Sequence, residues 1–328
     1  MKKKKIIYIL ALILISICGY AQQNAQYNQY IFNELIINPA YAGTKGMLNA
    51  NAIYSKQWTG FDGSPTTQTL SIEGPVSIEK LMKGKTEKIS LGLHLINDRI
   101  GSQSQQGFFG SYAYKLLLPG NFKLSMGLSL GASYFSLDGA ELTTAYPDDP
   151  VVPKTMVRKL RLDSKTGVFL YSDRLYAGFS VSDLLAKAFH KNEDLLITQV
   201  SHYYLTSGYI FDIIPKFKLK PSVLVKCVSK SPTNIDLSSY ILYNDKFWLG
   251  ASLRFGSKVF NKNLENSLRE RDALILMMEY NINEKYRIGY AYTMTTTVLK
   301  NYAGHEIMLG YYFPEKIAIK KMEHIRYF

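Results

Sequence analysis

Strict alternation of apolar and polar residues runs through most of this chain and limits it to extended structure. From Phe122 to Tyr134, every second residue is apolar or aromatic, and the residues between them are Lys, Ser or Gly. The pattern recurs at 88–95, 175–182 and 286–294. Because strand side chains point alternately to opposite faces, each segment predicts a strand with one apolar and one polar face.

Two architectures satisfy this pattern. A soluble sandwich turns its apolar faces inward, whereas a transmembrane barrel turns them toward lipid and lines its lumen with the polar faces. Three features favour the barrel: the polar faces are rich in Gly and Ser, a route for export is present, and aromatic residues lie near segment ends. Those aromatic residues are Tyr54, Trp58, Phe108, Tyr134, Tyr171, Tyr243, Phe247, Tyr286 and Phe313.

Connection lengths strengthen the choice. Even-numbered connections between the expected strands are mostly tight turns, apart from 75–87, and the odd-numbered ones are longer: 59–65, 98–107, 137–159, 183–201, 229–233, 256–272 and 296–304. Outer-membrane barrels have short periplasmic turns and long extracellular loops. We therefore expect an all-β, antiparallel transmembrane barrel of about fourteen strands in the outer membrane. The strands are expected at 47–58, 66–74, 88–97, 108–118, 121–136, 160–171, 174–182, 202–212, 217–228, 234–243, 246–255, 273–281, 285–295 and 305–314.

The N-terminus reads as an export signal. Lys2 to Lys5 precede an apolar run at 6–17, and Gly19-Tyr20-Ala21 offers a cleavage site after a small residue. The apolar run is shorter than the roughly 20 residues of a spanning helix. We expect a signal peptide at 1–21, and the outer membrane of a bacterium as the destination.

Three further segments follow from these boundaries: 22–45, the barrel at 46–314, and a basic tail at 315–328. Residues 22–45 carry apolar side chains before Pro39, and we expect them to lie in the lumen or at its periplasmic mouth as a partial plug. A loose periplasmic arm is the alternative. In the tail, we expect contacts with a periplasmic partner, with Phe313 serving barrel assembly.

No catalytic or metal-binding pattern stands out. The chain has no HExxH, CxxC, GxSxG or P-loop motif, and its histidines lack the spacing of metal ligands. We expect a protein that is not an enzyme and has no cofactor. The formal net charge of +13 does not predict a nucleic-acid partner, because an export signal and a barrel place the chain elsewhere. Inward charges are expected to pair across the lumen or to attract an acidic guest.

Short sequence blocks point to a family. They are QYIFN at 29–33, INPAYAG at 37–43, QWTGFDGSPTTQ at 57–68, NDRIG at 97–101, WLG at 248–250, GYAY at 289–292 and GHEI at 304–307. Together they resemble the PorP/SprF family of type IX secretion system outer-membrane proteins, found in the Bacteroidota. Thr293 stands where the family pattern leads us to expect aspartate, so the loop after it is expected to differ.

The resemblance implies a role in exporting proteins or attaching them to the cell surface, gliding adhesins among them. It also implies the partners: outer-membrane lipid, a secreted surface protein bound through its C-terminal signal domain, and other secretion components, including periplasmic ones. Candidate contact residues are Trp58, Phe61, Asp62, Pro65, Asp98, Arg99, His305, Glu306, Arg326, Tyr327 and Phe328. Trp58 and Phe61 are alternatively membrane anchors. A diffusion porin or small-molecule transporter is the alternative function.

Overall fold

The computed structural model describes residues 28–76, 88–142, 153–185, 200–228, 231–257, 273–297 and 299–313. Its strands are β1 (Leu48–Lys56), β2 (Thr66–Pro75), β3 (Ile89–Ile100), β4 (Gln103–Leu117), β5 (Lys123–Asp138), β6 (Met156–Tyr171), β7 (Leu175–Ser182), β8 (His202–Tyr209), β9 (Phe211–Ile214), β10 (Phe217–Val228), β11 (Thr233–Tyr243), β12 (Phe247–Ser257), β13 (Ala273–Asn281), β14 (Tyr286–Thr295) and β15 (Ala303–Phe313). Short 3-10 helices are η1 (Tyr30–Phe32), η2 (Glu34–Ile36), η3 (Pro39–Tyr41), η4 (Pro119–Asn121) and η5 (Gly139–Glu141).

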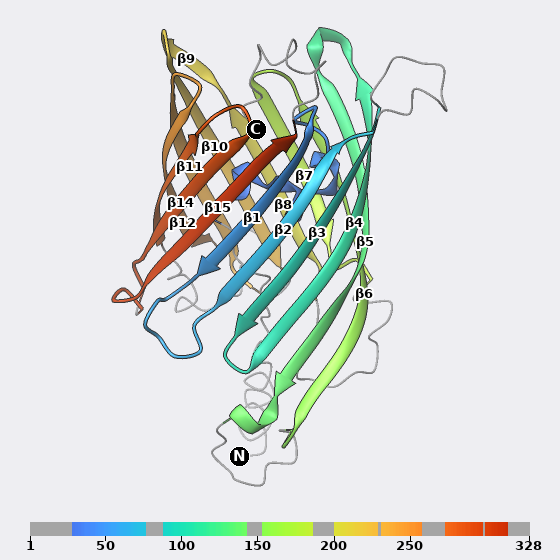
Figure 1. Cartoon of the computed structure of the whole chain (residues 1–328), viewed down its shortest axis with the longest axis vertical. Helices are drawn as coiled ribbons and strands as arrows, with labels where there is room; N and C mark the ends of the chain where they lie inside the picture. Colours follow the sequence, from blue (N-terminus) through green and yellow to red (C-terminus); the bar gives the residue numbers. More distant parts are fainter. Residues whose placement is uncertain are drawn as a thin grey trace, which may run out of the picture.

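The strands form one closed antiparallel barrel (Figure 1). Each strand pairs with its neighbours in sequence, and β1 closes the ring against β15, with Leu48 opposite Phe313. Only Ile210 separates β8 from β9, and both pair with β10, so they act as one interrupted strand. The result is the predicted barrel of 14 strands. Closure leaves no unpaired edge between the first and last strands.

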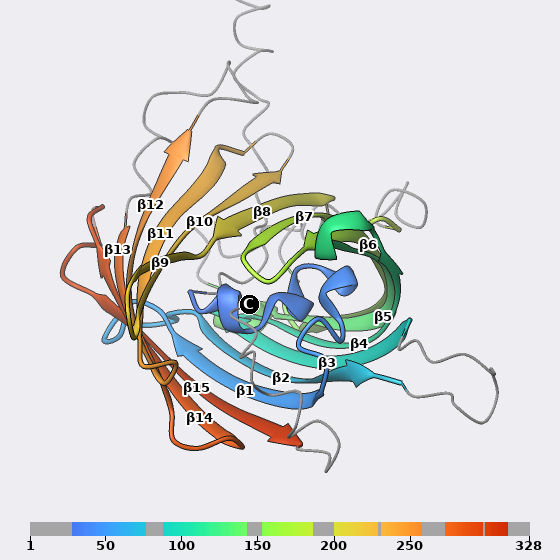
Figure 2. The same cartoon turned by 90° about the horizontal axis from the view of Figure 1, so that it is seen from above.

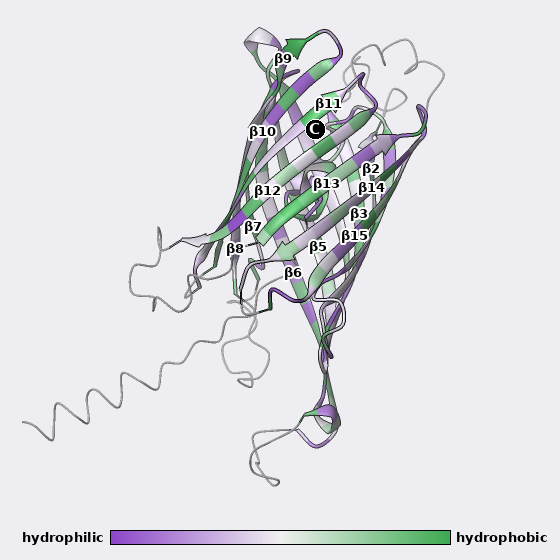
Figure 3. Cartoon of the chain, turned by 90° about the vertical axis from the view of Figure 1, so that its left-hand side faces the viewer, coloured by the Kyte–Doolittle hydropathy of each residue, from purple (hydrophilic) through white to green (hydrophobic). Residues whose placement is uncertain are grey.

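Alternating side chains give the wall its two faces. In β11, Asp236, Ser238 and Tyr240 are buried in the lumen, whereas Leu237 and Ile241 are exposed on the outside. Figure 3 shows hydrophobic and hydrophilic residues alternating along the strands in this way. Large exposed apolar side chains on the outward faces of many strands are the surface that a bilayer covers. Among the described residues, no helix is long and apolar enough to cross a membrane.

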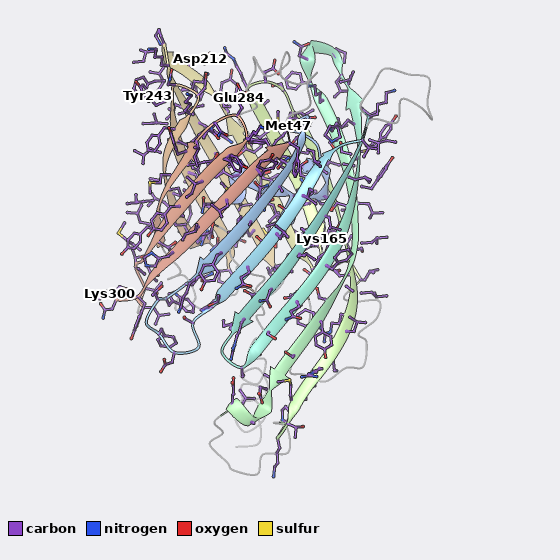
Figure 4. All side chains as sticks on the ribbon, in the orientation of Figure 1. Met47, Lys165, Asp212, Tyr243, Glu284 and Lys300 are labelled. Carbon is purple, nitrogen blue, oxygen red and sulfur yellow. The ribbon has the colours of Figure 1, made fainter. Side chains whose placement is uncertain are left out.

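Short turns lie at one end of the barrel and the longer loops lie at the other. Figure 4 places Met47, Asp212, Tyr243 and Glu284 near the short-turn end and Lys300 near the long-loop end, which is the extracellular one. The predicted longer connection at 98–107 is wrong, because β3 continues to Ile100 and β4 begins at Gln103. Polar residues there are strand residues that continue past the apolar band, joined by a tight turn with Gly101 at a φ of 54°.

Aromatic side chains gather on the outward face at the short-turn end. Ring centroids lie 4.6 Å apart for Tyr209 and Phe211, 4.8 Å for Phe217 and Tyr243, and 5.0 Å for Tyr286 and Tyr311. Aromatic rings at this position form the interface girdle of an outer-membrane barrel, which marks the periplasmic boundary of the apolar band.

Candidate functional site

The lumen contains the chain's own N-terminal segment. Residues 28–45 lie inside the ring of strands, where Figure 2 shows η1, η2 and η3 seen from above. Every residue of this stretch whose side chain is described is buried. We call residues 28–45 the lumenal segment.

The segment begins in the extracellular half of the barrel. The backbone N–H groups of Asn28 and Gln29 donate to the carboxylate of Glu306 at 3.1 and 2.8 Å. The Asn28 side chain donates to Thr293, close to the end of β14. From there the segment runs toward the short-turn end, where Leu48 begins β1.

Asn38 and Pro39 fix the bend in the middle of the segment. The Asn38 Oδ1 accepts from the Ala40 N–H at 3.0 Å and so caps η3, while Pro39 occupies its first position. The Asn38 amide also donates to the Val168 carbonyl of β6 at 3.1 Å. One side chain thus shapes the segment and ties it to the wall.

The segment ends in a network around Gly43. This residue has a φ of 69°, a left-handed conformation that glycine adopts without strain. Its N–H donates to the Glu73 carboxylate, and its carbonyl accepts from Lys115. Glu73 also accepts from the Asn49 amide at 2.6 Å. Glu73 and Lys115 were not predicted as contacts of this segment, although both are charged residues at inward positions of apolar strands.

The wall provides room for the segment through inward glycines. A Cβ atom at Gly127 would overlap the backbone of Pro39 and Ala40, and one at Gly167 would overlap the Asn38 side chain. A Cβ at Gly289 would overlap the Gln29 side chain. Glycine at these strand positions therefore permits close approach of the segment.

Inward aromatic residues hold the segment. The Phe32 ring lies edge-on to Tyr240 and Trp248, with centroids 5.9 Å apart in both pairs, and Tyr41 lies 5.5 Å from Phe169. Edge-to-face pairs of this kind contribute about 0.5–1.5 kcal/mol beyond area burial. The bulky side chains on the inner face of the barrel therefore pack around the lumenal segment.

Most lumenal charges pair with close neighbours or with the segment. Arg254 donates two hydrogen bonds to Asp236 on the adjacent strand, at 2.7 and 2.9 Å, and Lys226 lies 3.2 Å from the same carboxylate. Arg287 donates to the Phe32 carbonyl at 3.1 Å, and Lys165 donates to the Ile36 carbonyl at 3.2 Å. These cations bind the lumenal segment and the neighbouring carboxylates.

Glu34 is the exception in the lumenal segment. It is fully buried, and neither carboxylate oxygen accepts a hydrogen bond from the described residues. Burial raises the pKa of Glu34 to about 8, and the nearby charges of Lys220 and Lys45 oppose that rise only in part.

The extracellular rim is built around the first loop. Trp58 has a φ of 48°, the Thr59 N–H donates to the Ala303 carbonyl at 2.7 Å, and the Gly101 N–H donates to the Gly63 carbonyl at 2.8 Å. The Phe61 ring is 44% exposed and lies 5.4 Å from the Tyr302 ring. Loop 57–65, which contains Asp62 and Pro65, is therefore joined to two neighbouring turns.

Two further pairs of candidate residues lie in the described chain, and in each pair one side chain points into the lumen and the other points outward. Asp98 points inward and accepts from the Thr67 hydroxyl at 2.5 Å, whereas Arg99 points outward. Glu306 points inward to the lumenal segment, whereas His305 points outward and contacts Tyr290 at 2.7 Å. Arg326, Tyr327 and Phe328 lie outside the described residues, as does the predicted signal peptide. The structure therefore does not bring the candidate residues into one site.

No metal centre is formed within the described ranges, where no group of three or more His, Cys, Asp or Glu side chains could hold an ion. The closed ring with an apolar outer face, filled by its own N-terminal segment, defines an outer-membrane β-barrel. Within that class, residues 19–311 match the family model described as Type IX secretion system membrane protein PorP/SprF, and the chain belongs to this family. The family predicted from the sequence blocks is confirmed, and with it a type IX secretion component of the outer membrane.

Several solved structures are similar to this chain at low identity. A FadL homologue of Pseudomonas aeruginosa is 12% identical with a TM-score of 0.44, covering 87% of this chain and 93% of that one. BamA of Haemophilus ducreyi lacking POTRA domains 1–3 is 10% identical with a TM-score of 0.46, covering 82% and 70%. The CymD monoaromatic hydrocarbon channel is 13% identical with a TM-score of 0.45, covering 91% and 95%. No curated protein matches the chain.

Proposed function

We propose that this protein supports export and cell-surface attachment of secreted proteins, gliding adhesins among them, as a sealed barrel rather than a conduit. The observation that carries the proposal is the burial of residues 28–45 among inward side chains of most of the wall. The contacts to Glu306, Val168 and Glu73 hold the segment at both ends and in the middle. The role is non-enzymatic.

The same filling argues against a diffusion porin. A porin needs a water-filled lumen, whereas the buried rings of Phe32, Tyr240 and Trp248 pack together inside this one. A client protein would be held outside the lumen, at the extracellular mouth.

Loop 57–65 is the surface proposed for the client's C-terminal signal domain. Its backbone hydrogen bonds to neighbouring turns preorganise it, and Phe61 presents an exposed ring beside Tyr302. Preorganised aromatic side chains are favourable anchors, because little conformational entropy is lost when they bind. Periplasmic components of the secretion system are proposed to bind at the short-turn end, where the tail at 315–328 would contribute Arg326, Tyr327 and Phe328.

A disulfide lock tests the sealed barrel. The Asn33 Oδ1 accepts from the Ser71 hydroxyl at 3.0 Å, so the two side chains face each other, and mass spectrometry under non-reducing conditions verifies the cross-link between positions 33 and 71 before the assay. We would introduce Asn33→Cys and Ser71→Cys in a Cys227→Ser background, in cells without the native copy. Surface biotinylation with mass spectrometry then measures client display before and after reduction.

We expect equal client display from the locked and reduced forms, and a silent wild-type protein in planar bilayers. Ser71→Cys alone, in the same background, controls for the substitution. Display that appears only after reduction would show that the segment must move. A steady open channel from the wild type would favour the porin.

A further inference from the structure

The outward face at the extracellular end of β2–β4 is polar, unlike the apolar wall beneath it. Pairing places Gln68 opposite Asn97 and Asn97 opposite Gln106, so three amides lie side by side across three strands. The Asn97 amide donates to Gln68 at 3.2 Å. All three side chains are exposed, and none contributes to the lumen.

Two cationic side chains lie on the same outward face, two residues along the strands toward the extracellular end. Lys56 on β1 pairs with His305 on β15 and with Thr66 on β2, and Thr66 pairs with Arg99 on β3. Side chains two residues apart on a strand share a face, so Lys56 and Arg99 stand just beyond the row of amides. We call Lys56, Gln68, Asn97, Arg99 and Gln106 the outer polar patch.

The patch begins where the apolar band ends. One step toward the periplasm, the outward residues on β1–β4 are Ala52, Leu70, Leu95 and Phe108, which face lipid. Tyr54 lies opposite Gln68 and is 44% exposed, in the position of an interface aromatic. The patch therefore lies at the level of the outer-leaflet head groups.

Its positive charge is only partly balanced, since one acidic side chain lies near Arg99, one of its two cations. The outward positions of β15 and β1–β4 contain no acidic residue. Asp98 and Glu306, which are next in sequence to Arg99 and His305, point into the lumen instead. The acidic partner that the structure gives the patch is Glu141 of η5, 3.6 Å from Arg99, with both side chains at least half exposed.

Within the described strands of the opposite wall, no such patch is present. Outward positions near the extracellular ends of β10–β13 are mostly apolar and uncharged: Val225, Cys227, Thr233, Ile235, Leu253, Phe255, Ser257 and Leu274. A patch confined to one side of the barrel indicates a specific contact, because a general rim charge would surround it.

We propose that the outer polar patch binds the phosphorylated head group of an outer-leaflet glycolipid. Lys56 and Arg99 would bind the phosphate, since Arg forms bidentate hydrogen bonds with phosphate oxygens and Lys contributes a point charge. Basic clusters at membrane level attract anionic lipid head groups. The amides of Gln68, Asn97 and Gln106 would bind sugar hydroxyls and acyl carbonyls. This site is separate from the client surface on loop 57–65.

Native mass spectrometry of the full-length protein in detergent tests the site with monophosphoryl lipid A as the probe. We would compare the wild type with Lys56→Gln/Arg99→Gln. Lys246→Gln/Lys285→Gln is the matched control, because it removes the same charge from the short-turn end. Heat-modifiable migration on gels verifies that each variant is folded.

We expect the patch variant to retain the lipid at least about tenfold more weakly, while the control binds as the wild type does. Lipid A without phosphate should bind the wild type as weakly as the patch variant binds the phosphorylated form. Equal retention by wild type and patch variant would overturn the proposal. So would a patch variant that keeps the lipid and loses client display, because the patch would then bind protein. Should the patch variant fail to fold, Arg99→Gln alone takes its place.

Discussion

The carboxylate of Glu306, on the last strand, accepts a hydrogen bond from the backbone N–H of Gln29 at 2.8 Å, across 277 residues of sequence. The same carboxylate accepts the N–H of Asn28. A single side chain thus holds the start of the lumenal segment against the wall, in a region where Glu306 itself is fully buried.

Removal of that carboxylate should loosen the start of the segment. Glu306→Ala leaves two buried N–H groups without an acceptor, at a cost of about 1–3 kcal/mol for each. We expect faster labelling of an Asn28→Cys reporter by a maleimide in the Cys227→Ser background. Glu306→Gln retains one acceptor oxygen and should have the smaller effect. Equal labelling of all three proteins would contradict the proposed anchor.

A side chain at position 127 should displace the lumenal segment from the barrel wall. Gly127→Val places atoms where the backbone of Pro39 and Ala40 lies, so we expect a lower temperature of heat-modified migration and intermittent conductance in planar bilayers. Gly110→Val is the control, because the nearest atom to a Cβ there is 4.0 Å away. If both variants behave alike, the change reflects β-strand propensity rather than the segment.

Stability should fall with rising pH because of Glu34. Its pKa is raised by burial from 4.5 to about 8, so the folded protein binds more protons than the unfolded one between these values. The free energy of unfolding therefore decreases as the pH rises through that window. Lys45, whose pKa burial lowers from 10.5 to about 7, has its effect above pH 7.

From pH 5 to 7, the difference between the wild type and Glu34→Gln reports on Glu34, because the other buried titratable groups are common to both proteins. The temperature of heat-modified migration should decline over this range for the wild type and decline less for Glu34→Gln, which cannot ionise. Parallel curves for the two proteins would show that Glu34 is not the group that titrates.

The tail offers a test of the proposed periplasmic contact. A chain truncated after Glu315 retains Phe313, the last residue of β15, and should still assemble into a heat-modifiable barrel while client display falls. A barrel that displays its client normally would remove the docking role. Failed assembly would assign the assembly signal to Phe328.

Much of the wall could be predicted because each strand's alternation is local information. Phe217–Val228 and Ala273–Asn281 have the predicted bounds. The error at 98–107 arose because Arg99 and Gln106 are polar residues on the outward face, where a membrane strand is expected to be apolar. They read as loop, although they pair as strand.

The lumenal contacts could not be predicted, because they join residues far apart in sequence. Asn38 was visible as part of a motif, but its bond to Val168 depends on how β6 meets the segment. Inward glycines such as Gly127 and Gly167 were visible only as signs of close packing, without the partner that approaches them.

The seam between β1 and β15 has a consequence for how this barrel is made. The lumenal segment continues directly into β1 at Leu48, and its far end is bonded to Glu306 on β15. Both β1 and β15 are therefore joined to the lumenal segment. We therefore expect the segment to lie in the lumen when β1 and β15 pair, so that the machinery that closes the ring closes it around a filled interior.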